Sequence, residues 1–129
     1  MPAWKRFEDI DIWRLAREIC RDIWNVTRQK SFDCDSGLVR QMLNSSGSIM
    51  DNVAEGFERG TNGEFKTFVG YAKASAGELR SQLLRAHDRK FLTDDEIELI
   101  EAKVMRFSRQ SKALIRRLNE HPGGFRIQN

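Results

Sequence analysis

Apolar residues return every three or four positions along four successive stretches of this 129-residue chain. Such spacing places them on one face of an α-helix, which repeats about every 3.6 residues. Between these stretches, "ERGTNG" at 58–63 favours a turn, and "TDDE" at 93–96 has the pattern of a capping box that starts a helix. After the last stretch, Pro122 and the two glycines that follow it forbid further helix. The sequence therefore predicts helices at about residues 8–29, 37–58, 64–90 and 94–119.

The fold class follows from this pattern. No stretch shows the alternation of a strand or a two-residue hairpin signal. The chain is long enough for one hydrophobic core and too short for two. Four amphipathic helices with short connections pack most simply as an up-and-down bundle. We therefore expect an all-α, single-domain four-helix bundle over residues 1–129, with a loose tail at 120–129.

The sequence also restricts the cellular setting. Nowhere do about 18 apolar residues run together, and the N-terminal residues lack the apolar core and cleavage site of a signal peptide. Cys20 lies within an apolar repeat and Cys34 in an expected loop, a distribution that does not indicate a disulfide framework. We expect a protein of the reducing cytoplasm that is neither exported nor inserted into a membrane.

Polar residues follow the second and third expected helices at alternating steps of four and three. These two stripes mix short Ser, Asn and Gln with single acids and arginines, as hydrogen-bonded contacts between helices require. We call the two stripes together the polar seam and expect it to be at least partly buried, between helices or between subunits. The alternative is the ordinary solvated side of an amphipathic helix. The polar seam comprises Gln41, Ser45, Ser48, Asn52, Glu55 and Arg59 on the second helix, and Tyr71, Ser75, Glu78, Gln82, Arg85 and Arg89 on the third.

Glycines interrupt the same two helices. Each lowers helix propensity by about 1 kcal/mol relative to Ala. A close approach of two helices would offset that cost, because a glycine has no Cβ. The expected close approaches are at Gly47, Gly56, Gly70 and Gly77.

The stretch "SIMDNVAEGFERGTNGEFKTFVGYAKASAGEL" at 48–79 resembles a known signature. It is similar to the "S-I-P-x-N-I-A-E-G … R … F … A-R-G-S-x-x-E-L" pattern of small bacterial four-helix-bundle proteins, which are named after the 23S ribosomal RNA intervening sequences that encode some of them. "FEDIDIWRLAREI" at 7–19 and "KFLTDDE" at 90–96 extend the resemblance over most of the chain. The departures are Met50, where the pattern often has Pro, and Ala74, where it has Gly.

This resemblance implies a four-helix protomer in a ring-shaped homopentamer. It also implies a relation to the accessory variability determinant of diversity-generating retroelements, a basic pentamer that works with a reverse transcriptase and binds nucleic acid. The implied partners are further copies of the chain, RNA or DNA, and another protein such as a reverse transcriptase. The residues that match signature positions are assigned first to structural hydrogen bonding and second to ligand contact. They are Asn52, Glu55, Arg59, Ser75 and Glu78.

The fourth expected helix is basic. The net charge of the chain is only +3, so any preference for a polyanion depends on where the charges lie. Between residues 103 and 117 there are six cations and no acid, and we expect them to be exposed together opposite the apolar face. Such a surface binds the phosphates of a nucleic acid without recognising its base sequence. The alternative is a solvated face that maintains solubility. The cations are Lys103, Arg106, Arg109, Lys112, Arg116 and Arg117, and Arg80, Arg85, Arg89 and Lys90 extend them.

The aromatic residues point to a core and not to base stacking. Those on apolar arcs are expected to be buried, which leaves no evident stacking platform. Near the chain ends, Trp4 and Phe125 are expected to be free to contact a partner. The residues expected in the core are Trp13, Trp24, Phe65, Phe68 and Phe107.

Catalytic signals are weak. His87 and His121 are distant in sequence and have no cysteine at ligand spacing, and "DCD" at 33–35 is a common kind of loop. Glu55 and Glu78 could pair across two helices, but the Glu-x-x-His motif of di-metal bundles does not occur. We expect no enzyme, no metal and no cofactor. The favoured function is an oligomeric accessory or scaffold protein that binds nucleic acid electrostatically, and the alternative is a protein–protein interaction module.

Overall fold

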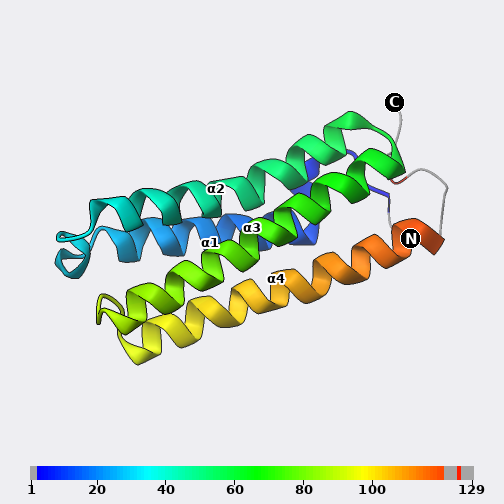
Figure 1. Ribbon diagram of the computed structural model, residues 1–129. Coiled ribbons are helices and arrows are strands. Elements are labelled where there is room, and N and C mark those ends of the chain that lie inside the picture. The colour runs from blue at the N-terminus through cyan, green and yellow to red at the C-terminus, as the bar shows by residue number, and fades with distance from the viewer. Residues whose placement is uncertain (1–2, 121–124, 126–129) are drawn as a thin grey trace.

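Four antiparallel helices form an all-α bundle in a computed structural model of the chain (Figure 1). The structure describes residues 3–120 and Phe125. The long helices are α1 (Asp11–Thr27), α2 (Ser36–Arg59), α3 (Asn62–Asp88) and α4 (Asp94–Glu120), with short 3-10 turns η1 (Phe7–Asp9) and η2 (Lys30–Phe32). No strand occurs among the described residues. The predicted fold class is confirmed, and the helix bounds agree with the predicted ones to within three residues.

The starts of α2, α3 and α4 follow from local polar groups. Asp35 accepts a hydrogen bond from the Leu38 backbone N–H and so caps α2. Thr61 caps α3 in the same way through the Glu64 N–H. At the start of α4, the Thr93 hydroxyl accepts from the Glu96 N–H at 3.1 Å, and the Glu96 carboxylate accepts from the Thr93 N–H at 2.9 Å. This is the capping box that the sequence predicts.

The turn between α2 and α3 is short because Gly60 reverses the chain. Its φ of 90° lies in the left-handed region, which glycine adopts without steric cost. The two helices then run side by side and make the most extensive helix pair of the bundle (Figure 1). Gly56 is buried against α3, whereas Gly47, Gly70 and Gly77 have no non-local atom near the place of a Cβ. The predicted close approach is therefore confirmed at Gly56, and the other three glycines make no such approach within the described chain.

The core runs along the bundle axis and is built from the apolar faces of all four helices. Fully buried side chains include Ile19 and Ile23 from α1, Met42 from α2, Leu79 from α3 and Phe107 from α4. Trp13 is buried as predicted. No helix in the described part of the chain is long and apolar enough to cross a membrane.

Trp24 lies outside this core, so its predicted burial is wrong. Its side chain is 51% exposed at the surface of α1. The apolar arc of α1 is wider than the face that the neighbouring helices cover, and Trp24 lies at the edge of that arc. Ile23, the preceding residue, takes the buried position.

Phe125 closes one end of the bundle, and the prediction that it is free is wrong. Its side chain is 1% exposed and its ring lies 4.5 Å from that of Phe65 and 5.6 Å from that of Phe57. The backbone N–H of Trp4 donates to the Phe125 carbonyl at 2.9 Å, and the Trp4 ring meets Phe65 edge-on. The aromatic rings at the junction of α2 and α3 would face solvent without this cover. The rest of the predicted tail, 121–124 and 126–129, lies outside the described residues.

Candidate nucleic-acid interface and the polar seam

The second half of α4 carries a face of exposed cations. They alternate with the buried residues Val104, Phe107, Leu114 and Leu118, which fix the helix on the bundle. Within the described part of the chain, none of these cations forms an ion pair with a carboxylate. Their charge is therefore available to an external anion. We call them the α4 basic face: Arg106, Arg109, Lys112, Arg116 and Arg117.

Lys103 does not belong to this face, and its predicted exposure is wrong. Its side chain is only 21% exposed, and its Nζ lies 2.8 Å from Asp22 Oδ2 and 3.7 Å from Glu18 Oε1. Both acids are on α1, which packs beside α4. The cation therefore joins two helices instead of facing solvent.

The α4 basic face also spreads around its helix. Arg117 lines a hollow of about 440 Å³ with Trp4 and Asp11, between α4 and the N-terminal part of the bundle. Arg109 lines a hollow of about 330 Å³ with Arg80 between α3 and α4. The cations of the α4 basic face therefore lie on both sides of α4 and do not form a single straight row.

The predicted extension of this surface along α3 is mostly engaged elsewhere. Arg80 pairs with Glu101 of α4 at 3.3 Å. Arg85 donates to Gln41 at 2.9 Å, and Arg89 pairs with Asp35. Lys90 is exposed in the turn that follows α3.

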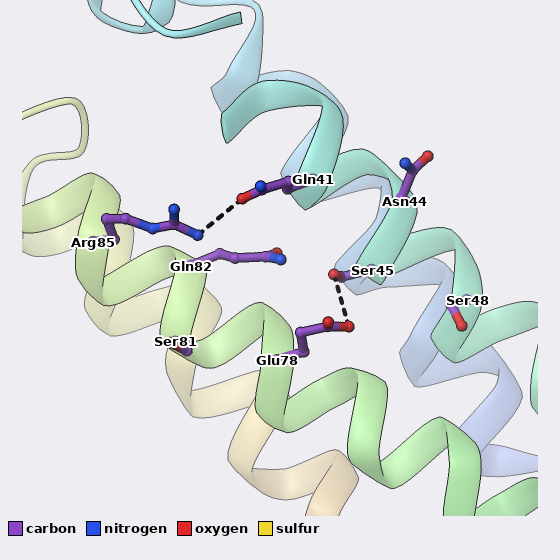
Figure 2. A pocket seen from close by; sticks show the side chains of 8 residues that line it. All are labelled: Gln41, Asn44, Ser45, Ser48, Glu78, Ser81, Gln82 and Arg85. Atoms are coloured by element: carbon purple, nitrogen blue, oxygen red, sulfur yellow. Dashed lines mark hydrogen bonds between the residues drawn. The ribbon is translucent and has the colours of Figure 1, made fainter. Parts of the chain in front are cut away.

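The polar stripe on α2 faces the polar stripe on α3. Ser48 and Ser75 share a hydrogen bond at 3.0 Å, and Ser45 donates to Glu78 at 3.4 Å. Figure 2 shows the Ser45–Glu78 hydrogen bond and, further along the helices, the Gln41–Arg85 bond. Asn52 donates from its amide to the backbone carbonyl and the hydroxyl of Ser48, both at 2.9 Å. The polar residues thus join two helices side chain to side chain.

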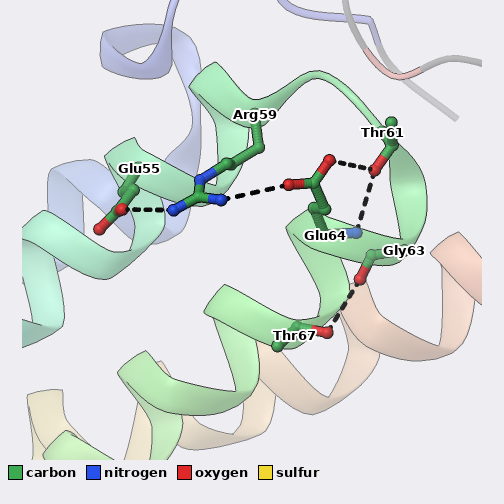
Figure 3. Close-up of polar contacts among 6 residues, drawn as sticks. All are labelled: Glu55, Arg59, Thr61, Gly63, Glu64 and Thr67. Atoms are coloured by element: carbon green, nitrogen blue, oxygen red, sulfur yellow. Dashed lines mark hydrogen bonds and ion pairs between the residues drawn. The ribbon is translucent and has the colours of Figure 1, made fainter.

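At the other end of the polar seam, Arg59 contacts two carboxylates and an aromatic ring (Figure 3). One guanidinium nitrogen lies 3.0 Å from Glu55 and another lies 3.5 Å from Glu64, while the group as a whole lies 4.9 Å from the centre of the Phe68 ring. The hydrogen bond that Arg59 donates to Glu55 raises the pKa of Arg59, and Glu64 adds to the effect. Thr61 holds Glu64 by a further hydrogen bond at 3.1 Å. These contacts link the end of α2 to the start of α3.

Burial varies along the polar seam and is greatest at Ser45 and Gln82. Ser45 is 5% and Gln82 is 6% exposed, whereas Gln41, Glu55 and Glu78 are exposed, and Asn52 and Ser75 are intermediate. A hollow of about 570 Å³ opens along this part of the seam (Figure 2). The side-chain oxygen Oε1 of Gln82 is buried there without a hydrogen-bond partner.

Sequence reasoning missed two members of this arrangement. Glu64 and Phe68 lie in the first two turns of α3, and they complete the surroundings of Arg59. Glu64 stands three residues after the cap Thr61, which is the spacing of a capping box and the signal that could have identified it.

No group of three His, Cys, Asp or Glu side chains in the described residues is placed to hold a metal ion. His87 Nε2 instead lies 2.7 Å from Asp94 Oδ1 across the turn between α3 and α4. Cys20 and Cys34 are both free thiols.

Comparison with known proteins gives both a family and a structural relative. The family described as "23S rRNA-intervening sequence protein" matches residues 8–113. A crystal structure of a protein of unknown function from the S23 ribosomal protein family of Bacteroides thetaiotaomicron is 19% identical, with a TM-score of 0.73. The match covers 81% of this chain and 97% of that one, and at this identity it shows a shared fold. The comparison with curated proteins yields no match. Because the family match spans most of the bundle, the chain belongs to the 23S rRNA-intervening sequence protein family.

Proposed function

We propose that this chain is a non-enzymatic, homo-oligomeric accessory or scaffold protein that binds nucleic acid through the α4 basic face in the cytoplasm. One observation carries the proposal. Five exposed cations lie within 12 residues of one rigid helix, from Arg106 to Arg117, and no described carboxylate pairs with any of them. A phosphate backbone that replaces its counterions with such cations gains affinity from the ions released.

The family supports RNA as the first ligand to test. Its description refers to an intervening sequence of 23S ribosomal RNA, and the family match covers all of α1, α2 and α3 and most of α4. The α4 basic face has no zinc site or recognition-helix signature, so it is proposed to read charge and shape without base sequence.

The proposed assembly is a homo-oligomer, with five subunits expected from the resemblance to the family's ring-shaped members. A symmetric ring would present the α4 basic face once per subunit and thereby raise the avidity for a polyanion. The relation to the accessory variability determinant of diversity-generating retroelements belongs to the same proposal, with a reverse transcriptase as the candidate protein partner. Native mass spectrometry of the purified chain tests the subunit count.

Fluorescence-anisotropy titration with a structured RNA and with a DNA duplex, repeated over a series of salt concentrations, tests the binding. We expect the logarithm of the association constant to fall linearly with the logarithm of salt, by about 0.9 for each duplex phosphate contacted. Arg109→Glu and Arg116→Glu should each lower the affinity and flatten this slope, and the double variant should abolish binding at moderate salt. Arg40→Glu, an exposed reversal on α2, changes the net charge equally and should have a small effect.

The outcome decides between two functions. Unchanged affinity in the Arg109→Glu/Arg116→Glu variant would overturn the assignment of the α4 basic face. No binding of RNA or DNA even at low salt would overturn the nucleic-acid function as a whole and leave a protein–protein interaction module.

A further inference from the structure

A half-exposed tryptophan and three arginines lie together on α1 and at its C-terminal end, on the side of the bundle where α1 meets α2. Trp24 is 51% exposed and borders a hollow of about 570 Å³. Cys20 of α1 and Met50 of α2 supply apolar parts of the lining. The volume falls in the range of small-ligand pockets, about 300–1,000 Å³.

One guanidinium group, that of Arg28, lies over this tryptophan, while that of Arg17 lies over the Trp13 ring at 5.6 Å. Arg28 lies over the Trp24 ring with its central carbon 5.1 Å from the ring centroid. Arg17 and Arg21 line the same hollow. None of the three arginines pairs with a carboxylate among the described residues. We call this surface the Trp24 patch: Arg17, Arg21, Trp24, Arg28 and Met50.

The acids of α1 do not neutralise the patch. Glu18 and Asp22 both lie beside Lys103 of α4, at 3.7 Å and 2.8 Å. This part of α1 therefore separates its charges, with Glu18 and Asp22 on the α4 side and unpaired cations on the side of the hollow. This separation favours an anionic ligand, because an uncharged apolar partner would bury three guanidinium groups without compensation.

We propose that the Trp24 patch binds single-stranded nucleic acid by stacking one unpaired base on the indole of Trp24. The base lies over the apolar lining that Met50 contributes, and Arg17 and Arg21 contact the flanking phosphates. Arg28 covers part of the indole and moves aside or stacks on the base. A tryptophan and nearby arginines are the combination that proteins use to hold single strands.

This inference rests on the proposed function for the ligand class but assigns a different surface and a different form of the ligand. The α4 basic face acts on phosphates alone and accepts a duplex. The Trp24 patch requires a base that is free to leave its stack, so it favours loops and single-stranded ends. A structured RNA that carries both could contact both surfaces.

A pair of fluorescent oligonucleotides of about 12 residues separates stacking from charge. One is oligouridylate, and the other has the same sugar–phosphate backbone without bases. The wild-type protein should bind the oligouridylate about tenfold more tightly, since the abasic strand has no base that can stack on the indole. Trp24→Ala should remove this preference, and Trp24→Phe, which keeps an aromatic face, should retain much of it.

Two controls accompany these variants. Tyr71→Ala removes another exposed aromatic side chain, 53% exposed on α3, and should keep the preference for bases. Arg17→Gln should weaken binding of both oligonucleotides by a similar factor, because it removes a phosphate contact. Circular dichroism verifies that each variant folds.

Intrinsic fluorescence provides a second measurement. Oligouridylate should quench part of the tryptophan emission of the wild-type protein, and Trp24→Phe should abolish that quenching, since Trp13 is buried and Trp4 packs on Phe65. The abasic strand should quench much less.

The results distinguish the two proposals. Equal binding of both oligonucleotides by the wild type, or a preference that survives Trp24→Ala, would overturn stacking while leaving the charge-based function intact. Binding of neither oligonucleotide, together with no binding of structured RNA or duplex DNA, would overturn both. A changed oligomer mass in Trp24→Ala with an unchanged preference for bases would identify the patch as a protein contact and also overturn stacking.

Discussion

Gly56 of α2 faces Phe68 of α3 so closely that a Cβ on the glycine would lie 2.6 Å from the Phe68 Cβ. The same Cβ would lie 3.2 Å from a ring carbon of Phe65. An added methyl group would therefore force α2 and α3 apart or displace a buried ring. Gly56→Ala should therefore lower the free energy of unfolding by about 1–3 kcal/mol through overpacking. Denaturation by urea measures the effect.

Gly77→Ala provides the opposite case. This glycine is exposed on α3 and has no non-local atom within 4 Å of an added Cβ. Helix propensity then dominates, and the substitution should raise the free energy of unfolding by up to about 1 kcal/mol. If both alanine variants shifted stability in the same direction, the close approach of α2 and α3 would not be the reason that Gly56 is a glycine.

Ser111 tests the cost of an unsatisfied polar group. Its hydroxyl is completely buried on α4 and has no hydrogen-bond partner among the described atoms. Ser111→Ala should raise the free energy of unfolding by about 1 kcal/mol, because it removes a buried group that loses its water on folding. Ser46→Ala is the matched control: Ser46 is equally buried but donates to the Leu43 carbonyl at 3.1 Å, so its loss should be neutral or destabilising. A lower melting temperature for Ser111→Ala would contradict the prediction.

Phe125→Ala should lower the free energy of unfolding by about 3–5 kcal/mol, as expected for a buried phenylalanine. The ring covers Phe57 and Phe65, and its removal exposes both. Tyr71→Ala, at an exposed position where the ring packs edge-on against Phe68, should lower stability by about 1 kcal/mol at most. Thermal melts measure both variants. Equal melting temperatures would contradict the packing of Phe125 described above.

Glu96 connects stability to pH. Hydrogen bonding from the Thr93 backbone N–H, aided by Gln29 at 2.6 Å, lowers the pKa of Glu96 below its ordinary value of 4.5. A carboxyl whose pKa is lowered by folding stabilises the fold above the unfolded-state pKa, and this stabilisation disappears as pH falls through the folded-state pKa. Glu96→Gln should thus be less stable than wild type near neutral pH, by up to about 1 kcal/mol, and equally stable in strong acid.

Denaturant titrations of wild type and Glu96→Gln over a pH series measure this difference. Glu98→Gln changes the charge equally at an exposed position of the same helix, and its difference from wild type should stay small. A stability difference for Glu96→Gln that persists unchanged into strong acid would exclude ionised Glu96 as its source.

The fold is readable from the sequence because its determinants are local. The apolar repeat of each helix, the cap at Thr93 and the turn at Gly60 act within a few residues of chain. Antiparallel neighbours follow from short connections. The predicted facing of polar groups on α2 and α3 has the same origin, since Ser48 and Ser75 occupy equivalent places beside two apolar arcs.

Contacts between distant segments explain what the sequence did not reveal. Lys103 has the same local spacing as its exposed neighbours, and only the position of α1 decides that it meets Asp22. Trp24 continues the apolar repeat, but no neighbouring helix covers it. Phe125 follows a proline and two glycines, and this local pattern does not indicate that Phe57 and Phe65 lie where the Phe125 ring can pack on them.

The hydrogen bond between the Trp4 N–H and the Phe125 carbonyl brings both ends of the described chain to the same end of the bundle (Figure 1). A circular permutant that links these ends and opens the chain at the exposed Gly60, in the turn between α2 and α3, should therefore preserve the helix packing. By the same geometry, the bundle can be inserted into a surface loop of a host protein through two neighbouring junctions. The fold is thus suited to being carried as a self-contained module.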